Sequence, residues 1–240
     1  MAVVNTKAIV FSSIKYGDTS LIVRCFTLKE GLKTYLIKGI LNTKRRKIKP
    51  AYFQPLTQLQ IIANHNNKGN LNSIKEVHVL HPYTNMYSNI FKQTIVLFLS
   101  EMLSNSIQEE EENSLLYYYL ENAINWLDSN DETSNFHLLF LLNLTRFLGF
   151  YPDLSESDKK CFNLLEGNFM GLVSEKEVIY GDDLVQFKKL LGINFDTINK
   201  VLFNKKERQQ VLRIIIRYFE LHLDGFKNPK SLGVLETVFS

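Results

Sequence analysis

Short runs of Val, Ile, Leu and Phe, separated by polar turns, fill the first 80 residues of the chain. They predict five strands, with turn residues such as Gly17 and Gly31 between them. The expected strands are 8–14, 21–26, 32–38, 56–63 and 72–80. Five short strands without a helix-length pattern between them are typical of a small barrel, and the OB-fold is the usual five-stranded barrel that binds nucleic acid.

The hydrophobic period changes from two to between three and four after Pro82. This period predicts amphipathic helices, and Asn204 with Glu207 three residues later forms a capping-box pattern at the start of the last one. The expected helices are 84–104, 115–127, 136–148, 182–190 and 205–226. Between them, 153–181 has three glycines and short apolar runs, so we expect a loop with one hairpin.

These patterns predict an α+β protein of two domains. The first, 1–82, is an OB-fold nucleic-acid-binding domain, and the second, 83–240, is an all-α helical domain with an irregular insertion near 153–181.

Charge divides at the same place. The segment up to Pro82 has 13 Lys and Arg against three Asp and Glu, and the remainder has 15 against 22, from totals of 28 and 25. A basic first part favours a polyanionic partner, and an acidic second part favours contacts with proteins.

Six of these 13 cations lie within 38–50, which contains no acidic residue. This segment lies between two expected strands and is bounded by Gly39 and Pro50, so it is predicted to be a loop. A lysine-protected strand edge is the simpler interpretation, but the density of charge favours a nucleic-acid contact, because each cation that meets a phosphate releases condensed counterions. The cations are Lys38, Lys44, Arg45, Arg46, Lys47 and Lys49.

Aromatic residues near this loop could stack on bases, a contact that tolerates any base sequence. Tyr35 and Tyr52 are candidates, whereas Phe53 is expected in the core. Lys15, Arg24, Lys33 and Lys38 either extend the groove or are ordinary exposed strand positions, and the sequence does not separate these alternatives.

Arg146 is a cation within a helix that is apolar nearly all round. A buried arginine needs a partner, and an internal salt bridge is the simpler explanation. The alternative is a carboxylate clamp beside Phe147 and Phe150, which suits an acidic peptide that ends in Phe.

The sequence contains no motif that indicates catalysis or metal binding. We found no phosphate-binding loop, nucleophile elbow or zinc-helix motif, and two cysteines cannot make a disulfide framework. No enzyme activity and no cofactor are expected. The chain start lacks the pattern of a signal peptide and no apolar run is long enough for a membrane span, so a cytoplasmic, nucleoid-associated protein without a membrane partner is expected.

In order and spacing, several landmarks resemble the RecO family of bacterial recombination mediators, over nearly the whole chain. The landmarks are 16–20 (YGDTS), 26–27 (FT), Gly31, 38–39 (KG), the basic loop, 54–56 (QPL), 148–152 (LGFYP) and 229–232 (PKSL). The resemblance implies an OB-fold followed by a helical domain. It further implies binding of single- and double-stranded DNA, annealing of complementary strands, and help in loading the recombinase RecA onto DNA coated with single-stranded-DNA-binding protein (SSB). The partners implied are RecR, the C-terminal tail of SSB and, indirectly, RecA.

One departure from the family concerns zinc. Many RecO-like proteins place two Cys-x-x-Cys pairs after the Leu-Gly-x-x-Pro segment, but here 153–181 contains only Cys161 and no histidine. A structural zinc site needs four nitrogen or sulfur ligands, so no metal site is expected. A small apolar cluster is expected instead, from Phe162, Leu164, Leu165, Phe169, Met170 and Leu172.

Two other function classes fit the same residues. One is an RNA-binding or ribosome-associated OB-fold protein with a helical scaffold domain, and the other is a structural adaptor whose basic loop meets an acidic protein. Binding to the SSB tail would favour a recombination mediator, and the absence of any nucleic-acid affinity would favour the adaptor.

Overall fold

The computed structural model describes residues 2–42, 48–66, 71–171 and 176–239. Residue contacts divide the chain into two compact units. Unit 1 comprises 1–129 with 229–231, and unit 2 comprises 130–228 with 232–240. This grouping differs from the predicted boundary at residue 82, because two helices belong with the barrel in unit 1.

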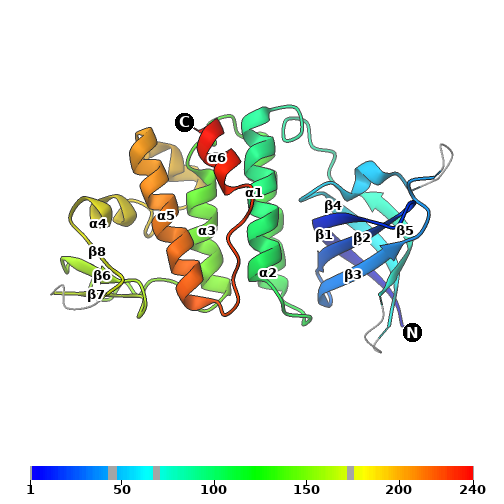
Figure 1. Cartoon of the computed structure of the whole chain (residues 1–240), viewed down its shortest axis with the longest axis horizontal. Coiled ribbons are helices and arrows are strands. Elements are labelled where there is room, and N and C mark those ends of the chain that lie inside the picture. Colours follow the sequence, from blue (N-terminus) through cyan, green and yellow to red (C-terminus); the bar gives the residue numbers. More distant parts are fainter. Residues whose placement is uncertain (1, 43–47, 67–70, 172–175, 240) are drawn as a thin grey trace. The chain divides into compact units, whose positions relative to one another are not determined.

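Unit 1 begins with five antiparallel strands in the order β3-β2-β1-β4-β5 (Figure 1). They are β1 (Ala2–Tyr16), β2 (Ser20–Thr27), β3 (Gly31–Ile37), β4 (Gln58–His65) and β5 (Ser73–Val79), with a 3-10 turn η1 (Pro50–Phe53) before β4. Asn72 joins the two edges, because its N–H donates to Thr34 O at 3.0 Å and its O accepts from Leu36 N at 2.9 Å. This parallel bridge beside Tyr35 closes the sheet toward a barrel.

Alternation of side chains explains why these segments form a barrel. On β2, Leu21, Val23 and Cys25 are buried, whereas Ile22 and Arg24 are half-buried on the other face. The inward residues pack with those of the other four strands into one apolar core. An irregularity between Val10 and Ser12 bends the long first strand, as a bulge does.

Two helices complete the larger part of unit 1: α1 (Ile90–Ser106) and α2 (Ser114–Ser129). They lie beside the barrel in Figure 1, and Tyr117 of α2 stacks on Phe26 of β2 with ring centroids 6.4 Å apart. The prediction that the first helix begins at residue 84 is wrong. Asn89 caps it instead, since the N–H groups of 84–86 donate to Asp128 rather than to a helix.

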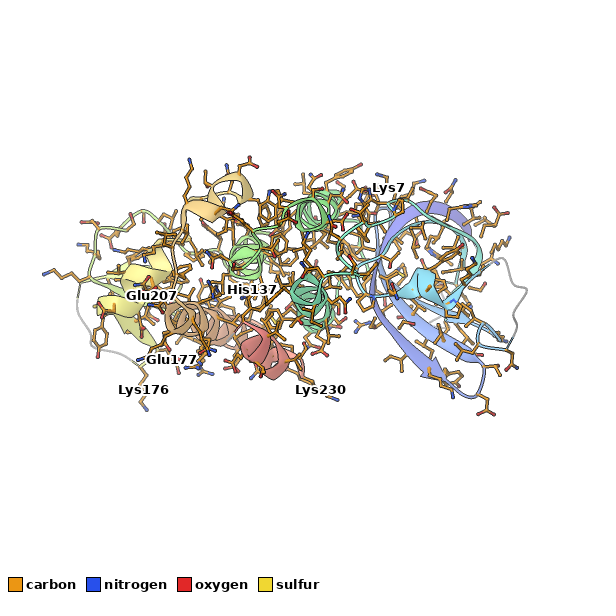
Figure 2. The ribbon with its side chains drawn as sticks, turned by 90° about the horizontal axis from the view of Figure 1, so that it is seen from above. Lys7, His137, Lys176, Glu177, Glu207 and Lys230 are labelled. Atoms are coloured by element: carbon orange, nitrogen blue, oxygen red, sulfur yellow. The ribbon has the colours of Figure 1, made fainter. Side chains whose placement is uncertain are left out.

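Unit 2 is mainly helical. Its helices are α3 (Phe136–Phe147), α4 (Gly181–Lys188), α5 (Lys205–His222) and α6 (Leu232–Val238), with a 3-10 turn η2 (Phe195–Lys200). The expected capping box is confirmed, because the Asn204 side chain accepts from Glu207 N at 2.9 Å and Glu207 accepts from Asn204 N at 2.7 Å. Figure 2 shows Glu207 at this end of α5.

The second part of the chain is not all-α as was predicted, because it contains a small three-stranded sheet. It consists of β6 (Cys161–Asn163), β7 (Asn168–Met170) and β8 (Val178–Tyr180) in the order β7-β6-β8. A single hairpin was expected here. The η2 and α6 segments were also not predicted, because each spans fewer than eight residues and shows too few turns for a helical period. The α+β class with a five-stranded barrel first is confirmed.

No helix among the described residues is long and apolar enough to cross a membrane.

Candidate nucleic-acid interface

Three predicted cations are exposed on the barrel. Lys15 lies at the end of β1, Lys38 directly follows β3, and Lys49 precedes η1. They therefore lie at strand and turn ends, where long side chains can meet a polyanion. The other four cations of the predicted basic loop, Lys44, Arg45, Arg46 and Lys47, lie outside the described residues.

Arg24 has a structural contact. It is half-buried, and its Nη1 donates to the carbonyl oxygen of Ser104 at 3.4 Å. Ser104 is in the last turn of α1, where carbonyls lack helical partners and a cation is favourable. Burial lowers the pKa of Arg24. Arg24 thus links the barrel to α1, which is a role other than the predicted nucleic-acid contact.

Tyr35 cannot be a base-stacking residue. Its side chain points into the barrel and is 0% exposed, so no ring face is available, and this part of the prediction is wrong. The outward positions of β3 are its neighbours, Thr34 and Leu36, because side chains alternate along a strand. Phe53 is buried as expected, and Tyr52 packs partly against the same core.

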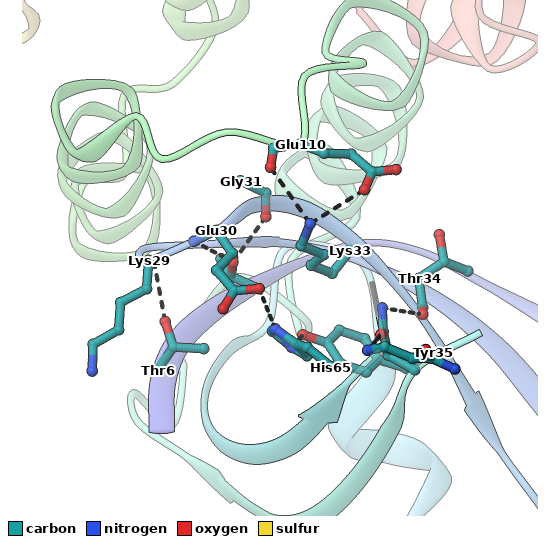
Figure 3. Close-up of polar contacts among 12 residues, drawn as sticks. Thr6, Lys29, Glu30, Gly31, Lys33, Thr34, Tyr35, His65 and Glu110 are labelled. Atoms are coloured by element: carbon teal, nitrogen blue, oxygen red, sulfur yellow. Dashed lines mark hydrogen bonds and ion pairs between the residues drawn. The ribbon is translucent and has the colours of Figure 1, made fainter. Parts of the chain in front are cut away.

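Tyr35 instead belongs to a buried polar chain, which Figure 3 shows. Its hydroxyl lies 2.8 Å from His65 Nε2, and His65 Nδ1 contacts the Glu30 carboxylate. Burial, with the nearby Cys25 and Glu30, raises the pKa of Tyr35. The contacts among these three side chains link β3, β4 and the turn before β3, so they stabilise the barrel.

The acidic segment 108–112 contacts the barrel at the start of β3 (Figure 3). Glu109 O accepts from Leu32 N at 3.0 Å, and the Lys33 ammonium lies 3.2 Å from the Glu110 carboxylate. Lys33 is therefore already paired with an anion. Lys15, Lys38 and Lys49 lie at other strand and turn ends of the barrel.

Two exposed side chains that the sequence analysis did not select lie on the outer face of the sheet. Ile14 is 62% exposed and Tyr16 is 56% exposed. They are two residues apart, so they share a face of β1. Alternation along the sequence would not reveal them, because the register shift between Val10 and Ser12 reverses the parity of β1, so that Ile9 faces outward before the shift and Ile14 and Tyr16 face outward after it.

In unit 2, Arg146 is exposed rather than buried. Its guanidinium carbon lies 3.8 Å above the centroid of the Tyr151 ring. The premise of a buried cation within α3 is therefore wrong, and so is the internal salt bridge built on it. The helix is apolar over most of its surface, but position 146 faces outward.

The two neighbouring phenylalanines are half-buried. Phe150 stacks on His222 with centroids 4.9 Å apart and contacts Tyr218 and Phe219 edge-on. Phe150 thus anchors 148–152 to α5. Phe147, at the end of α3, lies beside the exposed Arg146 in the chain.

The predicted apolar cluster between Phe162 and Leu172 is present in part. Phe162 is 0% exposed and contacts Phe169, Phe187 and Tyr218. Leu164 is buried, but Leu165 is 52% exposed, so its inclusion was wrong. Leu172 lies outside the described residues. Within the described ranges, no group of three or more His, Cys, Asp or Glu side chains could hold a metal ion.

Comparison with known proteins gives two family matches that together cover most of the chain. The family model "Recombination protein O N terminal" matches residues 1–83, and "Recombination protein O C terminal" matches residues 87–232.

Similar proteins span the same length. "DNA repair protein RecO" of Flavobacterium johnsoniae is 48% identical over 237 residues, which cover 99% of each chain. Proteins of the same description are 44% identical in Christiangramia forsetii, over 98% of this chain and 99% of that one, and 36% identical in Bacteroides fragilis, over 98% of each. The chain therefore belongs to the RecO family of DNA repair proteins, which are recombination mediators and not enzymes.

Proposed function

We propose that this protein binds single- and double-stranded DNA through its barrel and anneals complementary strands. The observation that supports this most is the concentration of positive charge before Pro82, with Lys15, Lys38 and Lys49 exposed at the barrel ends. Two DNA strands repel each other through their phosphates. A cationic surface that neutralises both backbones lowers this repulsion and lets complementary bases meet.

The acidic part of the chain supports a second role, in contacts with other proteins of the pathway. We propose that it helps to load the recombinase onto SSB-coated DNA, with RecR as a partner. The proposed contact for the SSB tail is Arg146 with Phe147 and Phe150, because an exposed guanidinium beside aromatic side chains suits a C-terminal Phe carboxylate.

We also propose that residues 1–82 are the domain that binds nucleic acid.

Strand annealing tests the main proposal. Two complementary oligonucleotides, labelled with a donor and an acceptor fluorophore, are mixed with the purified protein, and the rate of pairing is followed. We expect the protein to accelerate pairing, and the double variant Arg45→Ala/Arg46→Ala to accelerate it less.

A salt titration of single-strand binding gives an independent readout. The slope of log affinity against log salt should flatten by about 0.7 for each cation–phosphate pair that the double variant removes. The matched control is Lys205→Ala/Lys206→Ala, which removes two exposed cations from unit 2. An unchanged slope in the barrel variant, or an equal change in the control, would place the DNA contact elsewhere. Stronger binding to RNA of the same sequence would favour an RNA-binding function.

A further inference from the structure

The outer face of the β1–β2–β3 sheet is covered along one half of its length. Ile9, Phe26 and Leu32 pair across the three strands, and Phe26 stacks on Phe11 at 5.8 Å and on Tyr117 of α2 at 6.4 Å. The next row, which includes Arg24, ends this covered half, because Arg24 donates to Ser104 O of α1. In the part of the chain that the structure describes, the helices of unit 1 thus cover the sheet as far as Arg24, whereas Ile14 and Tyr16 beyond it are more than half exposed.

Apolar side chains continue on the same face beyond Arg24. Ile14 pairs with Ile22, and Ile22 pairs with Leu36, so the three side chains form a row across the sheet. Tyr16 follows two residues after Ile14 on the same face. We define the outer patch as Ile14, Tyr16, Ile22 and Leu36. Ile14 and Tyr16 are more than half exposed, and Ile22 and Leu36 are half-buried.

The chemistry next to the outer patch indicates the kind of partner. Tyr16 pairs with Ser20, and Gly39 N donates to Ser20 Oγ at 3.2 Å. Leu41 N also donates to Thr19 O at 2.9 Å. These bonds hold Gly39 and Leu41 against the β1–β2 turn, so Lys38, which directly precedes Gly39, lies near the edge of the patch.

An apolar surface bordered by cations is complementary to a chain that has phosphates outside and flat apolar faces inside. Single-stranded nucleic acid has this chemistry, because its bases are unstacked from a partner strand and available to aromatic rings. A duplex hides the same faces within its stack. An apolar protein partner would not require the dense positive charge of the adjoining segment.

We propose that the outer patch binds the bases of single-stranded nucleic acid, with the Tyr16 ring stacking on one base while exposed lysines of the barrel, such as Lys38, hold the phosphates. The inference rests on the proposed DNA-binding function and adds the site at which unpaired bases are recognised. It also gives a reason for the exposed Ile14 and Tyr16, since large apolar surfaces left open on a sheet mark interaction sites.

The test compares Tyr16→Ala with Tyr180→Ala. Tyr180 lies in unit 2 and is 58% exposed, close to the 56% of Tyr16, so it matches the removal of an exposed tyrosine without touching the barrel. Fluorescence anisotropy measures the affinity of each variant for labelled oligothymidylate and for a duplex of the same length, at one salt concentration. Circular dichroism checks that each variant is folded.

We expect Tyr16→Ala to weaken oligothymidylate binding about tenfold, the effect of removing one base–aromatic stack, and to leave duplex binding within about twofold of the parent protein. Tyr16→Trp should keep the single-strand affinity, because it keeps a ring. Tyr180→Ala should change neither affinity.

Two results separate failure of the patch from failure of the proposed function. Suppose that the parent protein binds DNA. If Tyr16→Ala then has the same affinities as Tyr180→Ala, or loses affinity equally for both substrates, the outer patch alone is overturned. Parent protein without affinity for either substrate at low salt overturns the DNA-binding function and the patch together.

Discussion

The ammonium group of Lys92 donates a hydrogen bond to the backbone carbonyl of Asp128 at 2.8 Å, and both side chains are almost fully buried. Lys92 thereby satisfies a carbonyl at the end of α2. The Asp128 carboxylate in turn accepts from the N–H groups of Thr84, Asn85 and Met86. Burial would raise the pKa of Asp128, but these backbone donors outweigh it and leave the pKa below its ordinary value.

Asp128→Ala should destabilise unit 1. It leaves three backbone donors without their acceptor, and bonds to a charged group are worth about 1.5–3 kcal/mol each, so a decrease of about 3 kcal/mol or more in the free energy of unfolding is expected. Urea unfolding measures it. Asp131→Ala removes an exposed carboxylate three residues later and should change the free energy of unfolding by less than about 0.5 kcal/mol. Equal effects of the two variants would contradict the role given to Asp128.

Gly31→Ala should destabilise the protein more than Gly17→Ala. Both glycines have positive φ, +62° and +58°, and an alanine in that region costs about 1–2 kcal/mol. A Cβ at Gly31 would also lie 2.2 Å from Glu111 O, whereas at Gly17 nothing lies within 4 Å. The Gly31 variant must therefore also displace the acidic segment. Urea unfolding of both variants checks this, and equal decreases in stability would mean that the segment moves without cost.

The strands, the main helices and the Asn204 cap followed from local patterns, because alternation, helical period and capping depend on neighbouring residues. Long-range contacts did not. Tyr35 was assigned to the outside because its parity on β3 depends on which face becomes the core. Arg146 is exposed although α3 is apolar at most of its positions, because the outward side of a helix is set by what packs against it and not by its average composition. The role of Asp128 depends on a turn more than 40 residues away, which no local pattern contains.

Stability should fall as pH decreases below about 6.5, because of His137. This side chain lies in α3 within unit 2 (Figure 2) and is 1% exposed. Burial, together with the charge of Arg208, lowers its pKa from 6.5 to about 3. The unfolded chain therefore takes up a proton that the folded chain does not. Between these pH values the decrease in the free energy of unfolding should approach about 1.4 kcal/mol per pH unit.

The variant His137→Gln should lack this component of the pH slope. Thermal melting between pH 7 and pH 4 measures it, and His78→Gln, which changes an exposed histidine of β5, is the control. A slope that persists in His137→Gln would assign the acid sensitivity to other groups.

Chelator should not destabilise the small sheet. Phe162 of β6 packs against Phe169 of β7, Phe187 of α4 and Tyr218 of α5, so aromatic contacts take the place of a metal site in this part of the chain. EDTA is expected to leave the melting temperature unchanged, and elemental analysis should find less than about one zinc per chain. Phe162→Ala should lower the free energy of unfolding by about 3–5 kcal/mol. A fall in melting temperature with EDTA, reversed by zinc, would show a metal site.

Arg146→Ala should weaken binding of the SSB tail with little effect on stability. Because Arg146 is exposed and stacks on Tyr151, its removal should cost only about 0.5–1 kcal/mol of folding free energy. A charge-assisted bond to the terminal carboxylate of the tail contributes about 1.5–3 kcal/mol, so affinity should fall about tenfold or more. DNA affinity should not change, since the cations of the barrel remain.

Isothermal titration with an acidic peptide that ends in Phe measures this effect. An amidated version of the peptide removes the carboxylate from the ligand side, and it should bind the parent protein as weakly as the free acid binds Arg146→Ala. Amidation should weaken binding to the variant little further, because the partner of the carboxylate is already absent. Arg213→Ala, an exposed arginine of α5, should keep both affinities and their difference. If amidation weakens binding to Arg146→Ala as much as to the parent protein, the carboxylate is held by another residue, and the tail site must be sought elsewhere in the chain.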